Sequence, residues 1–173
     1  MASGDALLVF TPHNNDPTDA DFATLDTILT TSADEPDDVV LVLDFDPGAT
    51  SEFASWVGVM PEHYASGGIT LDILWTSEAT SGAVVWEAAL KNLGDAVAML
   101  AATYAAKNTV TTTTDGTARA VNTSQITFTD GADMDSVLKN EMFRLTIDRD
   151  GDAGGDTMNS NDAELIAVYM RET

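Results

Sequence analysis

ITLDILWT (residues 69–76) and AVVWEAAL (residues 83–90) are the two stretches that decide the fold of this chain. In both, large apolar residues alternate with polar or small ones; the apolar face of the first ends at Trp75, and that of the second includes Trp86. Side chains of a β-strand point to opposite faces in turn, so this alternation predicts two strands that are each buried on one face. The segment TSEATSG between them predicts a hairpin-type connection.

The same pattern recurs along the rest of the chain, in short runs separated by Gly, Pro, Asp and Ser. The further runs that predict strands are 39–46, 53–60, 108–114, 125–129, 142–148 and 163–172. Together these runs predict an all-β fold of about eight strands, specifically an antiparallel β-sandwich of jelly-roll-like form. A parallel sheet would need regular crossover helices, and the pattern shows none.

Residues 88–107 interrupt the strand pattern. The segment AALKNLGDAVAMLAATYAAK is rich in helix formers, but Gly94 and Asp95 break it, and its first residues continue the alternation of the preceding strand. We therefore expect a strand that ends near Leu90, followed by a loop that holds at most one short helix, near 96–106.

The first 38 residues form a separate part of the predicted architecture. They hold a short apolar run, ALLVF, and then an Asp-, Thr- and Pro-rich stretch, 11–38, whose weak apolar stripe includes Phe22 and Leu25. We expect 1–38 to form an N-terminal strand and an acidic arm or loop, which either stays ordered on the sandwich or leaves it to lie on a neighbouring subunit. Residues 39–173 then form the β-sandwich, within one globular domain overall.

The charge balance excludes several classes of partner. The chain has 29 acidic and 7 basic residues, a formal net charge of −22 and no basic stripe, so its surface repels the phosphates of nucleic acids. The N-terminal residues lack the cationic segment of a signal peptide and an apolar run long enough to span a membrane. We expect a soluble protein, made in a cytosol, that binds neither nucleic acid nor membranes.

No catalytic motif is apparent in the sequence. Without cysteine, the chain has no disulfide, thiolate metal site or cysteine nucleophile, and it contains no nucleophile elbow, phosphate-binding loop or dinucleotide fingerprint. His13 and His63 stand in contexts that match no motif for a catalytic or metal-binding histidine. We expect no enzyme activity and no cofactor. An acidic hydrolase built from carboxylates such as Glu62 and Asp72 stays open as an alternative.

The segment IDRDGDAGGDTM is the candidate metal site. Counted from Asp150, a helix–loop–helix calcium loop would need a ligand where Gly154 stands and a glutamate where Asn161 stands, so that type of site is rejected. We favour the exposed turn of the last hairpin, with glycines supplying positive φ angles. A looser calcium site in a β-loop stays open as the alternative; its ligands would be Asp148, Asp150, Asp152 and Asp156.

Aromatic residues supply most of the candidates for contact with a partner. Trp75 and Trp86 lie on inward strand faces and are expected in the core. Trp56 is the best candidate for an interface aromatic, because FASWVGVM does not decide which of its faces points inward. The full set of interface candidates is Phe10, Phe22, Leu25, Trp56 and Tyr64.

Two segments, 59–90 and 143–172, resemble a family of small β-rich virion proteins of tailed phages. The first carries a Pro-x-x-Tyr motif, a Gly-Gly pair, an alternating strand that ends in Trp, a Thr-Ser-Gly turn and a second strand with Trp. The second carries an arginine, Asp-Thr-Met loop residues and then Asp-Ala-Glu-Leu. The chain differs from the usual sequence pattern of the family in two segments: the Ala-rich residues 96–106 and the acidic residues 16–38, which form a longer stretch here.

This resemblance implies a capsid decoration (cement) or head-fibre protein without catalytic residues. Such a protein would be a jelly-roll-like homotrimer that binds the major capsid protein on the outer surface of the virion head and stabilises the shell. A strongly acidic surface would keep free copies soluble and particles apart. The alternative is a tail-fibre or spike module that recognises host-surface glycan through Trp56, Tyr64 and the acidic loops.

Overall fold

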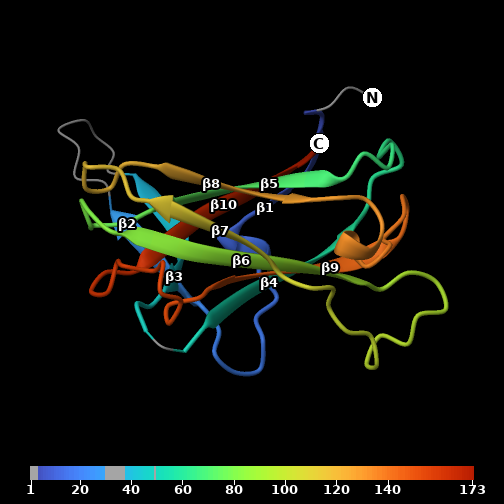
Figure 1. The fold of residues 1–173 in the computed structure, drawn as a ribbon, viewed down its shortest axis with the longest axis horizontal. Helices are drawn as coiled ribbons and strands as arrows, with labels where there is room; N and C mark the ends of the chain where they lie inside the picture. The colour runs from blue at the N-terminus through green and yellow to red at the C-terminus, as the bar shows by residue number, and fades with distance from the viewer. Residues whose placement is uncertain (1–3, 30–37, 49) are drawn as a thin grey trace.

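The fold is an antiparallel β-sandwich. The computed structural model describes residues 4–29, 38–48 and 50–173, and the ten strands in these ranges form a six-stranded and a four-stranded sheet that pack face to face (Figure 1). The first sheet has the order β2 (Thr24–Leu29), β3 (Val39–Phe45), β10 (Ala163–Glu172), β5 (Ile69–Thr76) and β8 (Asn122–Phe128), with β1 (Ala6–Phe10) also paired to β10. The second has the order β4 (Glu52–Val59), β9 (Met142–Arg149), β6 (Ala83–Asn92) and β7 (Asn108–Thr113).

The predicted fold class is therefore confirmed, with more strands than expected. Of the connections from β3 onward, only that between β6 and β7 stays within one sheet; the others cross between the sheets, as in a jelly roll. The helical elements among the described residues are two short 3₁₀ turns, Pro12–Asn14 and Ala132–Met134. No helix in the described ranges is both long and apolar enough to cross a membrane.

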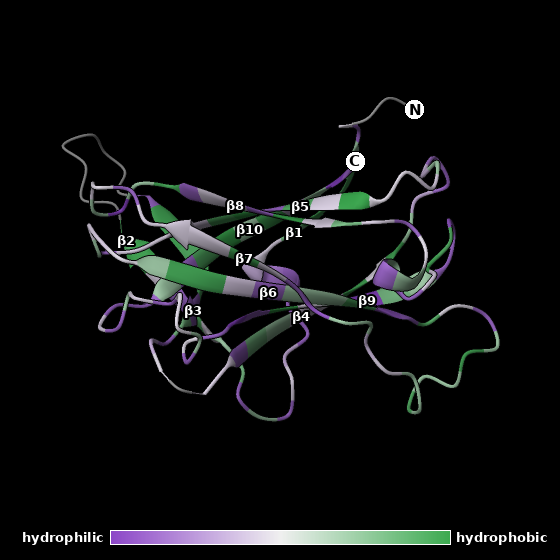
Figure 2. Ribbon diagram, in the orientation of Figure 1, coloured by the Kyte–Doolittle hydropathy of each residue, from purple (hydrophilic) through white to green (hydrophobic). Residues whose placement is uncertain are grey.

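The core lies between the two sheets and is built from the alternating apolar faces. Trp75 of β5 and Trp86 of β6 are both fully buried and meet across the core at 6.0 Å between ring centroids. Phe45 of β3 packs edge-on against Trp86 at 5.0 Å. These tilted and edge-to-face contacts suit the charge distribution of aromatic rings, and they join strands of opposite sheets. In Figure 2, hydrophobic stretches, in green, lie along β2, β5 and β6. The prediction that Trp75 and Trp86 are core residues is correct.

Two predicted hairpins are wrong. β5 pairs with β10 and β8, whereas β6 pairs with β9 and β7, so the segment between β5 and β6 crosses from one sheet to the other. β9 and β10 likewise lie in different sheets. In both cases the apolar faces of the two strands bury each other across the core instead of lying side by side on one surface.

Two other segments differ from, or refine, the predictions. Thr24–Leu29, expected in an arm or loop, forms strand β2 at the sheet edge, in register with β3 from Leu29 opposite Val39 to Thr24 opposite Asp44. The rest of the predicted arm includes 30–37, which lies outside the described residues. The Ala-rich segment contains no helix: β6 continues to Asn92, and 93–107 is an irregular loop.

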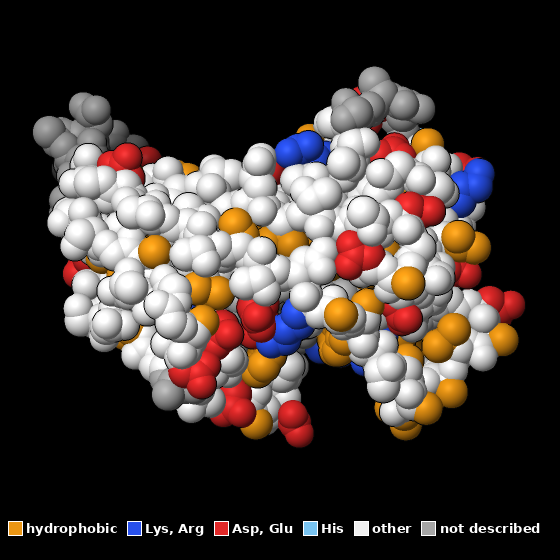
Figure 3. All heavy atoms as spheres, viewed as in Figure 1, with side chains coloured by type: hydrophobic (Ala, Val, Ile, Leu, Met, Phe, Trp, Pro, Cys, Tyr) orange, Lys and Arg blue, Asp and Glu red, His pale blue; other side chains and the backbone are white. Residues whose placement is uncertain are grey.

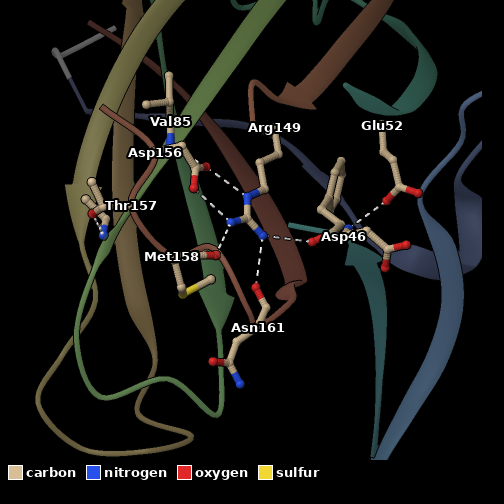
Figure 4. Close-up of polar contacts among 10 residues, drawn as sticks. Asp46, Glu52, Val85, Arg149, Asp156, Thr157, Met158 and Asn161 are labelled. Carbon is tan, nitrogen blue, oxygen red and sulfur yellow. Dashed lines mark hydrogen bonds and ion pairs between the residues drawn. The ribbon is translucent and has the colours of Figure 1, made fainter. Parts of the chain in front are cut away.

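The segment between β9 and β10 is held by a buried arginine. Arg149, 1% exposed, donates to both carboxylate oxygens of Asp156 at 2.8 and 2.9 Å, and to the backbone oxygens of Phe45, Met158 and Asn161 (Figure 4). None of the glycines in this segment has a positive φ angle, contrary to expectation. Gly151 is instead required by close packing, because a Cβ there would lie 2.0 Å from the backbone oxygen of Gly48. The segment therefore crosses from one sheet to the other and is fixed by hydrogen bonds to Arg149; it is not the exposed turn of a hairpin.

We predict that Arg149→Met lowers the free energy of unfolding by about 3–5 kcal/mol, because it leaves the Asp156 carboxylate buried without its partner. The measurement is urea unfolding followed by tryptophan fluorescence. Lys139→Met is the control: Lys139 pairs with Glu62 on the surface, where both side chains are more than half exposed, and its loss should cost less than about 1 kcal/mol. Equal effects of the two substitutions would contradict the role given to Arg149.

Candidate functional site

A cleft of about 320 Å³ lies over the outer face of the four-stranded sheet. Its floor includes Phe53 of β4, Ala89 of β6 and Thr146 of β9, and its walls come from 18–21 on one side and from Tyr104 and Lys107 on the other. In Figure 1 the loop before β2 and the loop after β6 project from the same side of the molecule, and Figure 3 shows the surface hollowed between two projections there.

Strand alternation places the floor residues. Ala54 and Trp56 of β4 are buried in the core, so their neighbour Phe53 points to the outer face. Thr146 of β9 lies between the core residues Leu145 and Ile147 and points outward in the same way. The pattern that builds the core therefore also builds the cleft floor.

Backbone hydrogen bonds to β4 anchor the first wall. The Ala23 N–H donates to the Phe53 oxygen at 3.0 Å, and the Phe53 N–H donates to the Asp21 oxygen at 2.8 Å. Nearer the start of the same loop, the Asp16 N–H donates to the Ser55 oxygen at 2.7 Å. Arg144 of β9 forms an ion pair with the Asp16 carboxylate at 3.2 Å. The carboxylates of the wall are thus carried by a loop tied to the sheet.

The second wall is part of the Ala-rich loop. The Ala105 N–H donates to the Leu90 oxygen at 2.9 Å, which fixes the loop against β6. The ammonium group of Lys91 lies over the ring of Tyr104, 4.8 Å from its centroid, and so covers one face of that ring. Burial raises the pKa of Tyr104, and the nearby Arg144 opposes the effect. Tyr104 is 37% exposed, so the rest of the ring is accessible to a ligand.

Lys107 links the second wall to the floor. Its Nζ lies 2.8 Å from Glu87 Oε2 and 2.7 Å from Asp148 Oδ2, and 5.3 Å from the centroid of the Phe53 ring. Burial lowers the pKa of Lys107, but hydrogen bonds with Asp148 and Glu87 outweigh this effect and raise it overall. Burial raises the pKa of Asp148 to about 6 even though Lys107 opposes the shift. Asp148 is fully buried, and its Oδ1 has no hydrogen-bond partner.

Positive charge is concentrated on this face. Of the seven basic residues of the chain, Lys107 lines the cleft, Lys91 contacts the lining residue Tyr104, and Arg144 pairs with Asp16 in the loop that forms the first wall. On a protein with a formal charge of −22, these side chains offset the negative charge of the cleft walls.

Three of the predicted interface residues are not available to a partner. Phe10 and Tyr64 are 3% exposed and Trp56 is fully buried, so their assignment to an interface is wrong. Trp56 packs against Phe10 at 5.8 Å, and its indole N–H donates to the Thr11 oxygen. The Tyr64 hydroxyl donates to Asp130, and burial together with this contact raises its pKa. Phe22 and Leu25 are 45% and 58% exposed, as a surface contact requires.

The structure does not gather the four carboxylates of the predicted calcium loop. Asp148 pairs with Lys107 on the outer face of β9, whereas Asp156 pairs with Arg149 in the interior. Asp150 lies beside Asp152, which raises the pKa of Asp150. Among the described residues, no group of three or more acidic or histidine side chains is arranged to hold a metal ion. The other carboxylates considered as an acid pair, Glu62 and Asp72, pair with Lys139 and Arg171.

Sequence reasoning missed the residues that line the cleft. Phe53 lies in FASWVGVM, whose pattern does not show which face points inward, and Trp56 was chosen from that run instead. Tyr104 and Lys107 lie in or next to 96–106, where composition indicates at most a short helix. One aromatic and one cationic residue within an otherwise Ala-rich loop were the signal available in the sequence.

A second hollow, of about 360 Å³, is polar and acidic. It is lined by Arg119, Ser160 and Asn161 and by the carboxylates Asp26, Asp44, Glu78, Asp162 and Glu164. Burial raises the pKa of Asp44 to about 7, and repulsion from Glu164, Asp26 and Asp162 adds to the shift. Asp44 Oδ1 is buried without a hydrogen-bond partner. This carboxylate destabilises the fold when it is ionised.

We predict that Asp44→Asn stabilises the protein at pH 8 and has little effect near pH 4. The pKa of Asp44 in the folded state lies above its ordinary value, 3.8, so the folded state binds the proton more tightly. Stability from this group is therefore lost as the pH rises from about 4, and the loss is complete above the folded pKa of about 7. Urea midpoints at the two pH values test this, with the exposed Asp95→Asn as control. A midpoint at pH 8 no higher than that of the wild type would contradict it.

Comparison with known proteins gives no family assignment. No family model and no curated protein matches the chain. Among solved structures, the xylan-binding CBM22-1 domain of Paenibacillus barcinonensis Xyn10C aligns with a TM-score of 0.47 and 10% identity, over 99% of this chain and 96% of that one. The TmCBM61 module, solved with β-1,4-galactotriose, aligns with a TM-score of 0.43 and 11% identity, over 96% and 88%.

A third similar structure is the enzymatically active domain of bacteriophage CBA120 tailspike protein 4. It aligns with a TM-score of 0.39 and 10% identity over 95% of this chain, but only over 19% of its own length. TM-scores and identities this low carry no argument about ligand or activity. The functional assignment therefore depends on the cleft itself.

Proposed function

We propose that this chain is a non-catalytic carbohydrate-binding module that holds a neutral glycan in the cleft over the four-stranded sheet. The observation that carries the proposal is the placement of Tyr104, whose ring is backed on one face by Lys91 and stands opposite a wall of carboxylates and hydroxyls. Phe53 supplies a second aromatic surface on the floor.

The chemistry of a sugar matches this lining. A pyranose ring has an apolar face of C–H groups, which stacks on an aromatic ring, and an edge of hydroxyl groups, which are both donors and acceptors. Asp19 and Asp21 supply acceptors. The Thr18 and Thr146 hydroxyls donate to the Ala20 and Ala54 oxygens, so they offer further acceptors to a ligand. A concave site that is mainly apolar, with a few directed polar groups, is the ordinary form of a small-ligand site.

Charge selects a neutral ligand over a charged one. The net charge of −22 opposes a uronate-, sulfate- or phosphate-bearing chain. A strongly basic ligand is also disfavoured, because Lys107 lines the cleft and Lys91 lies against the lining residue Tyr104.

We further propose that the module works on a tailed-phage virion, as part of a tail fibre or spike that recognises host-surface glycan. The support is the resemblance of 59–90 and 143–172 to small β-rich virion proteins. The glycan-binding residues differ from those expected from the sequence: Phe53 and Tyr104 replace Trp56 and Tyr64, which are buried. Immunogold label on tails, rather than on heads, is the expected result.

We predict that Tyr104→Ala weakens glycan binding by about 10- to 100-fold, equivalent to about 1.4–2.7 kcal/mol, because it removes the central aromatic surface of the cleft. Affinity electrophoresis in neutral polysaccharides (xylan, galactan, β-glucan) identifies the best ligand, and calorimetry with its oligosaccharide measures the dissociation constant. Tyr104→Trp, which keeps the stacking surface, should retain binding.

Tyr169→Ala is the matched control, because Tyr169 lies on β10 in the other sheet and does not line the cleft. Its dissociation constant should equal that of the wild type. Failure of the wild type to bind any neutral glycan, or equal affinity of Tyr104→Ala and wild type, would refute the proposal.

The second candidate function is capsid decoration, which one surface feature favours. Leu25, Leu29 and Val39 are 58%, 67% and 57% exposed. The register of β2 and β3 places all three on the same face at the sheet edge. Under this proposal the edge docks on the major capsid protein, and the chain acts as a homotrimer on the head. Cosedimentation with capsids that is lost in a Leu25→Ser/Leu29→Ser variant, together with a trimer mass by light scattering, would favour it over the glycan module.

A further inference from the structure

On the outer face of the four-stranded sheet, an amine and two carboxyl groups lie close enough together to form an amide bond. Lys107 Nζ lies 2.7 Å from Asp148 Oδ2 and 2.8 Å from Glu87 Oε2. The amine, the carboxyl group and a second carboxyl group that can carry a proton are therefore in simultaneous contact. This arrangement does not depend on the proposed glycan function.

The sheet register explains why the three side chains meet. Phe53 of β4, Asp148 of β9, Glu87 of β6 and Thr109 of β7 are direct partners across successive strand pairs and form one row. Lys107 immediately precedes β7 and extends over this row. The Thr109 hydroxyl donates to Glu87 Oε1 at 3.1 Å, which leaves Oε2 directed at Lys107. Backbone pairing therefore places Asp148 next to Glu87, and the two ion pairs hold the Lys107 side chain over them.

The environment of Asp148 makes the neutral form of its carboxyl group easier to reach, although the same contacts raise the pKa of Lys107 and favour its ammonium form. The side chain is fully buried, and its Oδ1 has no hydrogen-bond partner, so the ionised carboxylate is poorly stabilised. The Phe53 ring lies 5.3 Å from Lys107 Nζ and shields the pair from water on one side. Repulsion from Glu87 and Asp150 adds to the effect of burial in raising the pKa of Asp148 to about 6. The neutral acid, which is the form that a nucleophile attacks, is therefore accessible.

We propose that Lys107 and Asp148 form an intramolecular amide (isopeptide) bond, with Glu87 as the proton carrier. The resting pair is ionic, so a proton first passes from Nζ to the Asp148 carboxyl group. The amine then attacks Asp148 Cγ, which lies next to it because Nζ is within hydrogen-bonding distance of Oδ2. Glu87 takes a proton from the attacking nitrogen and returns it to the departing oxygen.

The step balances without any other reactant. The Nζ–Cγ bond forms, the Cγ–Oδ2 bond breaks, and Oδ2 leaves as water with two protons that began on the ammonium group. No group is oxidised or reduced, and Glu87 ends in its starting state. The product replaces a buried charge with a neutral amide, and Oδ1 remains as the amide oxygen. Lys107 keeps 37% of its side-chain surface exposed, which leaves a path for the released water.

The bond would tie the end of the loop that carries Tyr104 to the centre of the sheet. It joins positions 41 residues apart, so it would restrict the unfolded chain as a disulfide does, in a protein that has no cysteine. The second wall of the cleft would then be covalently fixed to its floor.

Intact-mass spectrometry of the purified full chain tests the proposal. The wild type should weigh one water less than its sequence requires. Lys107→Arg keeps a cation between the two carboxylates but cannot form this amide, and Glu87→Gln removes the proton carrier; both should show the full sequence mass. Lys139→Arg, at the exposed pair with Glu62, should retain the loss of water. Lys107→Arg should also lower the thermal midpoint by roughly 10 °C.

Peptide mapping separates the bond from other losses of water. Trypsin should release a branched peptide in which 92–119, uncut at Lys107, is joined to 145–149. Succinimides at Asp-Gly sequences such as Asp150-Gly151 also lose water, but hydroxylamine cleaves them, whereas it leaves the isopeptide intact. Full sequence mass in the wild type, or loss of water without the branched peptide, would overturn the proposal. Glu87 does not line the cleft, so glycan binding by Glu87→Gln at wild-type affinity, in a protein that has lost the amide, would show that the proposed function does not depend on the bond.

Discussion

The buried guanidinium of Arg149, at the end of β9, holds the two sheets together where the chain crosses from one to the other. Arg149 has five N–H donors, and the structure gives it five hydrogen bonds, two to Asp156 and three to backbone oxygens. A cation at this depth is tolerated only when its donors are satisfied and its charge is balanced. Asp156 in turn accepts from the Val85 N–H of β6, so one ion pair holds both sheets and the segment that crosses between them.

The same strand supplies the floor of the candidate site, because alternate residues of β9 serve opposite faces. Arg149 points inward, and its neighbour Asp148 points outward beneath Lys107. The row from Phe53 to Thr109 is therefore positioned by the pairing that also aligns the core. Two loops distant in sequence, one before β2 and one after β6, then rise on either side of it and form the cleft. A rigid sheet that displays residues between two anchored loops is a common basis for binding.

Strand positions were predictable, and strand partners were not. Alternation in 69–76 and 83–90 identifies which side chains are buried, since that follows from the local geometry of an extended chain. It does not say what buries them, and the same pattern is compatible with neighbours in one sheet or with strands facing across a core. The predicted hairpin failed for this reason. Trp56 shows the same limit, since both faces of its strand carry apolar residues and only the packed core decides which is inside.

The sequence by itself determined the all-β class, the buried faces of the long strands, the acidic surface and the absence of cysteine chemistry, because these depend on composition and on contacts between near neighbours. Only the tertiary structure decided that Asp148 and Asp156 belong to different environments, that Lys107 lies between two carboxylates, and that Tyr104 stands opposite 18–21. Those juxtapositions join residues far apart along the chain. Their free energy comes from burial and pairing, which exist only after the two sheets have closed.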